Sequence, residues 1–190
     1  FVKQKLNDSS ANSINFRFSV PTLDDDHWTN IKEIGGGRIV GEAVHAIDLA
    51  CYLFDSLPQS ISANAPIDKI KNKVKDNQVF LNINFANGAH AALQYFSEAN
   101  NILSKERLEV HGGGNSYILE DFKMLRYLEG SVDRSKTFSS GKGHKESLQV
   151  FFDYVRDKSQ NPFTWEEIKA VSKAAIIAQD FINSGQHHRV

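Results

Sequence analysis

The chain has 190 residues, a length that suits one domain with a sizeable core. Its 22 basic and 23 acidic residues give a formal net charge of −1, which excludes the broad basic surface of a typical nucleic-acid-binding protein. No apolar run approaches the roughly 20 residues that cross a membrane, no leader segment is recognisable, and the single cysteine, Cys51, excludes an internal disulfide. These features predict a cytoplasmic protein without a nucleic-acid or membrane partner.

The first residues, Phe1 to Leu6, have the pattern of the end of an amphipathic helix, and no initiator methionine precedes them. We therefore expect residues 1–190 to be a single domain of a longer protein. From Ser13 to Val20 apolar and polar residues alternate, which predicts a strand that Pro21 ends. Residues 22–34 have no regular period and predict a surface loop that carries Trp28 toward the next helix.

A glycine cluster followed by a long helical pattern is the most informative stretch. After Gly35 to Gly37, apolar residues recur at steps of three and four, which predicts one buried stripe on a helix: Val40, Val44, Ile47, Cys51 and Phe54. His45 and Asp48 lie at the border of this stripe with Glu42 beside them, so an imidazole and two carboxylates come within about one turn. A lone histidine there is more often structural than catalytic, so spacing alone leaves both interpretations open.

The same glycines also form G-x-G-x-x-x-G, which is close to a dinucleotide-binding fingerprint. That fingerprint requires a buried strand directly before it. Residues 26–33 are too polar to be such a strand. We therefore expect no Rossmann-type cofactor site within this chain.

Most of residues 59–138 are predicted to be strands joined by short turns. The candidate strands are residues 59–65, 78–85, 89–96, 105–111, 115–120, 123–129 and 131–138, and the lysine-rich stretch 68–76 is predicted to be a solvated loop. Asn87-Gly88 is a strong hairpin signal, and a two-residue turn there sets Phe85 opposite His90. With that register neither face of the hairpin is polar enough to stand in water, so helices are expected to cover one face and a second subunit the other.

The chain ends in two predicted helices. The first spans residues 146–157, and a capping box, Thr164-Trp-Glu-Glu167, begins the second, which Gly185 is expected to end. Both helices are expected to cover the sheet. His187-His188 is expected to be a frayed end and not a metal site.

Together these segments resemble one known family. Residues 35–49, Gly-Gly-Gly-Arg-Ile-Val-Gly-Glu-Ala-Val-His-Ala-Ile-Asp-Leu, resemble the motif G-G-G-x-L-x-D-x-G-x-H-x-x-D-L in the C-terminal domain of the Gfo/Idh/MocA oxidoreductases, the family of glucose-fructose oxidoreductase and inositol dehydrogenase. Residues 143–146 and 162–168 are similar to the last two helices of that domain. The resemblance covers essentially the whole chain. It implies an α+β fold class: an open, mostly antiparallel mixed sheet with helices on one face and the other face available for oligomerisation.

The resemblance also implies a function. The chain would be the substrate-binding and oligomerisation domain of an NAD(P)-dependent dehydrogenase that acts on a sugar, polyol or sugar-nucleotide hydroxyl. NAD or NADP would be bound mainly by a separate N-terminal Rossmann domain, without which the chain would be inactive. His45 matches the family's catalytic histidine, and an imidazole suits acid/base work near neutral pH. Glu42, Arg38, Trp28 and Asp48 are expected near the substrate.

One departure from the family pattern keeps an alternative open. Gly41 stands where the family has an aspartate one turn before the histidine, so a carboxylate that would orient His45 is missing. Glu42 is adjacent but rotated by about 100° on a regular helix, although some members share a G-E-x-x-H version. The alternative is a non-catalytic assembly module of the same fold. A third interpretation takes Glu42 and His45 as metal ligands with His27 or His90, but the second ligand pair of a di-metal site is absent.

Overall fold

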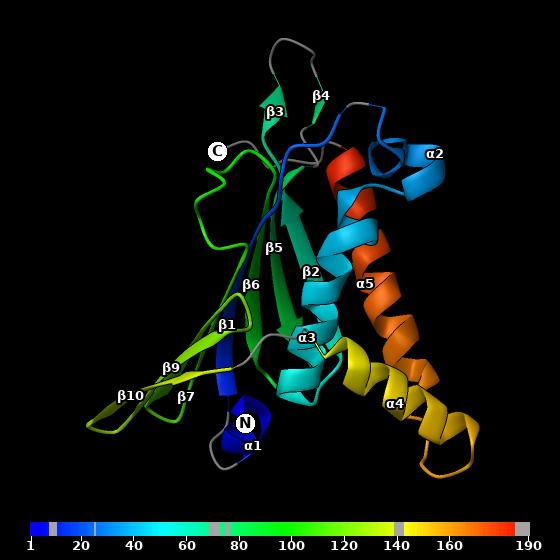
Figure 1. The fold of residues 1–190 in the computed structure, drawn as a ribbon. Helices are drawn as coiled ribbons and strands as arrows, with labels where there is room; N and C mark the ends of the chain where they lie inside the picture. Colours follow the sequence, from blue (N-terminus) through cyan, green and yellow to red (C-terminus); the bar gives the residue numbers. More distant parts are fainter. Residues whose placement is uncertain (8–10, 25, 69–72, 75–76, 139–142, 185–190) are drawn as a thin grey trace.

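The computed structural model describes residues 1–7, 11–24, 26–68, 73–74, 77–138 and 143–184. Its centre is an eight-stranded open sheet with the strand order β10-β9-β8-β7-β1-β6-β5-β2 (Figure 1). The strands are β1 (Ala11–Ser19), β2 (Pro58–Asn64), β5 (Gln78–Phe85), β6 (His90–Phe96), β7 (Glu106–Gly112), β8 (Asn115–Glu120), β9 (Met124–Glu129) and β10 (Val132–Thr137). A small ribbon of β3 (Ile67–Asp68) and β4 (Lys73–Val74) stands apart from this sheet.

The sheet is mixed. Strands β1 and β6 run parallel, whereas the other neighbouring pairs of the described sheet are antiparallel. The predicted α+β class with an open, mostly antiparallel mixed sheet is therefore confirmed. The seven predicted strands between residues 59 and 138 correspond to β2 and β5 to β10.

Helices cover one face of the sheet. Helix α3 (Val44–Phe54) packs on β1 and β6, and α5 (Trp165–Asn183) packs on β2 and α3 (Figure 1). The short α1 (Val2–Asn7) contacts α3. Thr164 accepts a hydrogen bond from the Glu167 amide at 3.1 Å, and the Glu167 carboxylate accepts one from the Thr164 amide at 2.8 Å, so the predicted capping box is present.

The hydrophobic core lies between this helical layer and the sheet. The alternation of β5 places one row of its side chains in the core and the other on the open face. Buried members of the core include Phe16, Ile47, Leu81, Ile83 and Ala175. None of the helices in the described part of the chain combines the length and apolar character that a bilayer-spanning segment requires.

The register of the β5–β6 hairpin differs from the predicted one by one residue. The turn has three residues, 86–88, because the Phe85 amide donates to the Ala89 carbonyl at 2.9 Å. Gly88 has a φ of +85°, as expected for a loop that ends in a left-handed residue and a bulge. Since side chains alternate along a strand, a slip of one residue moves every side chain of β6 to the other face.

This slip gives the open face of the hairpin a mixed surface, on which polar side chains lie beside the edge-to-face rings of Phe80 and Phe96. Asn84 pairs with His90, and Gln94 pairs with Phe80. The Nδ1 atom of His90 lies 3.1 Å from Oδ1 of Asn84. The predicted pairing of Phe85 with His90 was therefore wrong, because it assumed a two-residue turn.

Helix α4 (His144–Val155) also differs from its prediction. It is a helix close to the expected range, but none of its residues is buried. The expectation that both C-terminal helices cover the sheet therefore holds for α5 and is wrong for α4. The amphipathic pattern of α4 shows that it has an apolar face, but a local pattern does not specify which body covers that face.

The glycine segment begins with helical turns that the sequence did not predict. Residues Trp28–Asn30 form the 3₁₀ turn η1, and Lys32–Gly35 form the single turn α2. A π-helical turn, η2 (Ile39–Ala43), then leads directly into α3. A π turn holds about one residue more than an α turn, which shifts the buried positions along the chain. Ile39 and Ala43 at the two ends of η2 are buried, whereas Val40 and Val44 of the predicted stripe are only half-buried.

Most of the predicted loop 68–76, the predicted helix stop at Gly185 and the pair His187-His188 lie outside the described residues.

Candidate substrate cavity

A cavity of about 520 Å³ lies where α3 meets the sheet. Its apolar wall includes three aromatic rings of the strands and of the β8–β9 turn, Phe16, Phe18 and Phe122. Its polar groups are Glu42 of η2, His45 of α3, Tyr95 of β6, Lys105 and Glu106 at the start of β7, and His144 of α4. Apolar walls with a few fixed polar groups are typical of small-molecule sites.

A charged cluster fixes Glu42 in the wall of this cavity. The Arg38 side chain is 1% exposed, and its Nη1 atom lies 3.1 Å from Oε1 of Glu42. The other carboxylate oxygen accepts a 2.8 Å hydrogen bond from the Tyr95 hydroxyl, and the Arg38 guanidinium lies 5.3 Å from the centre of the Tyr95 ring. Both oxygens of Glu42 are thus held, so its carboxylate has one defined position.

Tyr95 remains a hydrogen-bond donor over the whole working pH range. Burial raises the pKa of Tyr95, and its hydrogen bond to the Glu42 carboxylate raises it further, while Arg38 opposes the shift. Because the phenol keeps its proton, it donates to Glu42 and leaves that carboxylate as an acceptor.

The glycine cluster serves packing around this site. A side chain at Gly35 would place its Cβ 2.7 Å from the Thr29 Cα, so glycine lets η1 approach α2. Thr29 in turn accepts a 2.9 Å hydrogen bond from Arg38. Gly37 has a φ of +102°, and a Cβ there would lie 2.3 Å from Oε1 of Gln179, the atom that accepts from the Ile39 amide at 3.2 Å. The glycines therefore allow close contacts within the fold.

His45 is exposed at the cavity, and among the described residues it has no hydrogen-bond partner. Besides Glu42, a charged group near His45 is Asp48, one turn further along α3. Three effects act on the pKa of the Asp48 carboxyl: burial raises it and is the largest effect, the charge interaction with His45 lowers it, and the charge interaction with Glu167 raises it. At Gly41 an added Cβ would have only an ordinary contact, 3.9 Å from the Gly35 carbonyl oxygen, so the missing aspartate is not excluded by space at Cβ.

The structure brings together only part of the predicted residue set. Glu42 and His45 line the cavity, and Arg38 lies behind Glu42. Trp28 is exposed and, like Asp48, is not among the lining residues.

Sequence reasoning missed four polar lining residues, Tyr95, Lys105, Glu106 and His144. With Phe85 opposite His90, Tyr95 would pair with Phe80, whereas the three-residue turn pairs it with the buried Val79. His144 lies in the segment 143–146 that resembles the family, so that resemblance was its available signal. For Lys105 and Glu106 the sequence gave no signal beyond their place at the start of a predicted strand.

Within the described part of the chain, neither a metal site nor a reactive thiol is apparent. No three His, Cys, Asp or Glu side chains of the described residues are grouped as a metal site would require. His27 contacts Thr29 at 2.8 Å, and His90 lies beside Asn84 on the open face. Burial, with the nearby Asp48, raises the pKa of Cys51 to about 12, so its thiol stays protonated.

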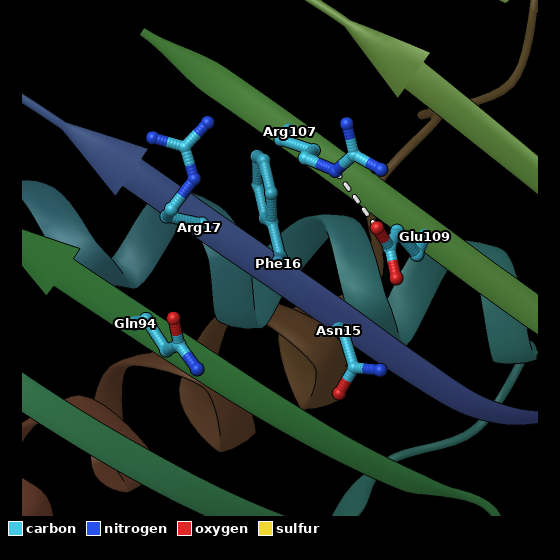
Figure 2. Close-up of a pocket in the computed structure, with 6 residues that line it drawn as sticks. All are labelled: Asn15, Phe16, Arg17, Gln94, Arg107 and Glu109. Carbon is cyan, nitrogen blue, oxygen red and sulfur yellow. Dashed lines mark hydrogen bonds and ion pairs between the residues drawn. The ribbon is translucent and has the colours of Figure 1, made fainter. Parts of the chain in front are cut away.

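A second hollow, of about 350 Å³, lies on the sheet and has no candidate catalytic group. Figure 2 shows Arg17 of β1 and Arg107 of β7, with Glu109, Asn15 and Gln94 around them. Nε of Arg107 lies 2.7 Å from Glu109, and Arg17 donates to Ser104 at 2.9 Å. These contacts make a polar patch across the centre of the sheet.

Comparisons with known proteins agree with this architecture. A family model described as the GFO/IDH/MocA C-terminal domain matches residues 10–118. A search of curated proteins gave no match. Similar solved structures include an aldose-aldose oxidoreductase from Caulobacter crescentus complexed with glycerol, which is 12% identical with a TM-score of 0.79 over 97% of this chain and 58% of that chain.

Two further structures are similar. A UDP-N-acetylglucosamine 3-dehydrogenase from Acidithiobacillus ferrooxidans is 12% identical, with a TM-score of 0.75 over 95% of this chain and 57% of that chain. A levoglucosan dehydrogenase in complex with NADH and levoglucosan is 18% identical, with a TM-score of 0.75 over 94% of this chain and 60% of that chain. At these identities the likeness shows the fold, and the chain spans less than two thirds of the length of each of these structures.

Proposed function

This chain belongs to the C-terminal domain family of the Gfo/Idh/MocA oxidoreductases, and on that premise we propose that it is the substrate-binding part of an NAD(P)-dependent dehydrogenase. The proposed reaction oxidises a hydroxyl group of a sugar, polyol or sugar nucleotide. The observation that carries the proposal is the cavity that joins His45 and Glu42 to an aromatic wall. Aromatic rings suit the apolar faces of a sugar ring, and fixed polar groups suit its hydroxyls.

His45 is the proposed acid/base residue. Its imidazole borders the cavity and is not occupied by another hydrogen bond from the described residues. It can therefore accept the proton of a substrate hydroxyl and return it in the reverse reaction. Because Gly41 supplies no carboxylate, we expect the bound substrate itself to fix the orientation of the ring.

Glu42 is the proposed anchor for a neighbouring hydroxyl. Arg38 and Tyr95 hold its two oxygens at 3.1 Å and 2.8 Å, and each carboxylate oxygen can accept more than one hydrogen bond. A hydroxyl donor bound to Glu42 would be placed beside His45, because both residues line the same cavity. Arg38 is a positioning residue that acts through Glu42.

The glycine segment of this chain does not fit a dinucleotide. The segment from Gly35 to Gly41 begins at the last residue of the helical turn α2 and not after a strand, and Gly37 is in close contact with Gln179. We therefore propose that NAD or NADP is bound mainly by a separate N-terminal Rossmann domain. Bound there, the cofactor supplies the redox chemistry, while this chain binds the substrate and handles its proton.

The open face of the sheet is the proposed surface for a homo-oligomer. No described helix covers it, and it mixes the polar patch around Arg17 with the exposed side chains of Phe80 and Met124. Such a mixed surface is typical of contacts between proteins that are also stable apart. The cytoplasmic location and the absence of nucleic-acid and membrane partners stay predictions.

The test measures reduction of NAD⁺ and NADP⁺ by the full-length protein with a panel of aldoses, polyols and UDP-sugars. His45→Gln is expected to lower kcat at least 100-fold with a thermal midpoint unchanged within error, since general acid/base groups contribute about 10²–10⁴-fold. The matched control is His90→Gln, because His90 lies on the open face, outside the cavity. Retention of wild-type activity by His45→Gln would refute the assigned role.

The alternative is a non-catalytic assembly module of the same fold. It is favoured by one observation, the glycine at position 41 in place of the family's aspartate. It predicts no cofactor reduction with any member of the panel and no saturable binding of these compounds. The two functions are therefore separated by the same set of measurements.

A further inference from the structure

Glu106 is a buried glutamate in the wall of the cavity, and the proposed reaction does not use it. It lines the cavity together with His45 and Glu42, although the residue is only 5% exposed. Removing a carboxylate from water costs free energy, and an ionised carboxylate can accept several hydrogen bonds. A glutamate kept in such a wall is therefore a candidate ligand-binding group.

Strand pairing places Glu106 in one row with two other cavity residues. Strand β1 lies between β7 and β6 (Figure 1), and its Phe18 pairs with Glu106 of β7 and with Tyr95 of β6. All three residues line the cavity, so they share one face of the sheet. The Tyr95 hydroxyl donates to Glu42 at 2.8 Å. A carboxylate therefore lies at each end of the row, with the Phe18 ring between them.

The β8–β9 turn fixes the Glu106 end of this row. The Glu106 amide donates to Oδ1 of Asp121 at 3.1 Å, and the Asp121 amide donates to the Glu106 carbonyl at 2.9 Å. Asp121 and Phe122 have φ of +50° and +54°, a left-handed backbone that is rare for a bulky residue. Phe122 lines the cavity, and its ring meets that of Phe16 edge-on with 6.4 Å between the centres. Such backbone strain is concentrated at functional sites, and here it supplies an aromatic ring to the cavity wall.

The dimensions of the row suit one ring-shaped molecule. Neighbouring strands lie about 4.8 Å apart, so the backbones of β6 and β7 on either side of β1 are separated by roughly 10 Å. A six-membered ring packed on Phe18 would direct hydroxyl groups from two opposite edges toward Glu42 and Glu106. Hydroxyls donate to a carboxylate, whereas an anionic group between two carboxylates would be repelled. Lys105 also lines the cavity, but it is exposed, so water and salt screen its charge.

We propose that Glu106 is a second hydroxyl anchor, and that the substrate is an uncharged ring, a monosaccharide or a cyclic polyol, bound between Glu42 and Glu106. The inference deepens the proposed function and rests on it, because it selects one class among the proposed substrates. His45 and Glu42 would hold the reacting edge of the ring, and Glu106 would hold the opposite edge. Glu106 is thus a specificity-determining residue that does not contact the reacting hydroxyl.

The test is isothermal titration calorimetry of the full-length protein, independently of turnover. The neutral probes are D-glucose, D-galactose, D-mannose and myo-inositol, and the charged probes are glucuronate and glucose 6-phosphate. A neutral ring is expected to bind more tightly than either charged probe, and Glu106→Gln is expected to weaken its binding at least tenfold, because the hydrogen bond to a charged acceptor is lost. The matched control is Glu129→Gln, which should bind as the wild type does. Glu129 is another half-buried glutamate of the sheet that accepts from a tyrosine hydroxyl, at 3.0 Å, and it is not among the lining residues.

Monodeoxy analogues of the tightest-binding ring separate a direct contact from a structural effect. The wild type is expected to bind one of these analogues at least tenfold more weakly than the parent ring. For that analogue Glu106→Gln should weaken binding less than twofold, because the hydroxyl that Glu106 holds is already absent. A purely structural role of Glu106 would weaken the binding of every analogue to the same extent.

Three outcomes would overturn the inference. The first is that none of the four neutral rings binds, and the second is that a charged probe binds more tightly than all of them. The third is a Glu106→Gln variant that binds the parent ring as the wild type does, or that loses the parent and every monodeoxy analogue equally. If Glu106→Gln does not fold, Glu106→Asp tests the same contact, since it keeps the charge but shortens the side chain by one methylene.

Failure of the proposed function and failure of this inference give different results. If only the proposed function fails, ring binding depends on Glu106 but no cofactor is reduced. If only the inference fails, the full-length protein reduces the cofactor and Glu106→Gln leaves that activity unchanged.

Discussion

Replacement of Arg38 by methionine tests whether the buried charge cluster holds the cavity wall. Arg38→Met keeps a long apolar side chain but removes the ion pair to Glu42 at 3.1 Å and the hydrogen bond to Thr29 at 2.9 Å. It also removes the cation above the Tyr95 ring. Glu42 would keep only its hydrogen bond from Tyr95, so its carboxylate would lose its counter-charge.

The magnitude follows from the burial of the two partners. Removing one partner of a buried ion pair costs about 3–5 kcal/mol. The Glu42 side chain is 31% exposed, so water still reaches it and the low end applies, about 3 kcal/mol of unfolding free energy. For a chain of this size each kcal/mol lowers the thermal midpoint by about 2–4 °C, so the expected decrease is about 6–12 °C.

The assay is urea and thermal unfolding of four proteins: wild type, Arg38→Met, Glu42→Gln and the double variant. The double variant should lose less than the sum of the single losses, with a coupling of about 1–3 kcal/mol, because no unpaired charge remains. The matched control is Arg126→Met, whose partner Asp133 lies at 2.6 Å with both side chains about half exposed, and which should lower the free energy of unfolding far less, because exposed ion pairs contribute little. Equal losses for Arg38→Met and Arg126→Met would refute the reasoning.

Two further variants test local features of the fold. Gly37→Ala should lower the free energy of unfolding by about 2–3 kcal/mol, from left-handed backbone strain and a displaced Gln179 hydrogen bond. Gly88→Ala, at a similar positive φ with open space around it, should lower it by only about 1–2 kcal/mol. Equal losses of the two variants in urea unfolding would count against the close contact at Gly37. Burial raises the pKa of Asp48, so its ionised form opposes folding, and Asp48→Asn should stabilise the protein slightly at pH 7. That gain should vanish as the pH falls below the unfolded-state pKa, about 3.9, and a gain that grows on acidification would contradict the sign.

Local patterns in the sequence were enough to locate most elements. The alternation in β1 and β5, the capping box of α5 and the apolar face of α3 beyond residue 47 each depend on residues within a few positions of one another. Side-chain periods of 2 and 3.6 are properties of single strands and helices. The family and the fold class followed from these segments and from the motif around His45.

The candidate site was only partly predictable for the same reason. His45 and Glu42 share one helical stretch, so their neighbourhood could be inferred from spacing. Tyr95 reaches Glu42 from β6, and its direction depends on one residue in the β5–β6 turn. His144 joins the cavity from α4, about 100 residues after His45 along the chain.

Short-range patterns were therefore sufficient for most of the strands, for the longer helices and for the family of this protein. Packing between distant elements fixes which face of β6 meets α3 and how Arg38 and Tyr95 hold Glu42, and it leaves the apolar face of α4 uncovered. The physical reason is that a repeating pattern specifies which face of an element avoids water. The body that meets that face is fixed by turn length and by contacts between residues far apart in the chain.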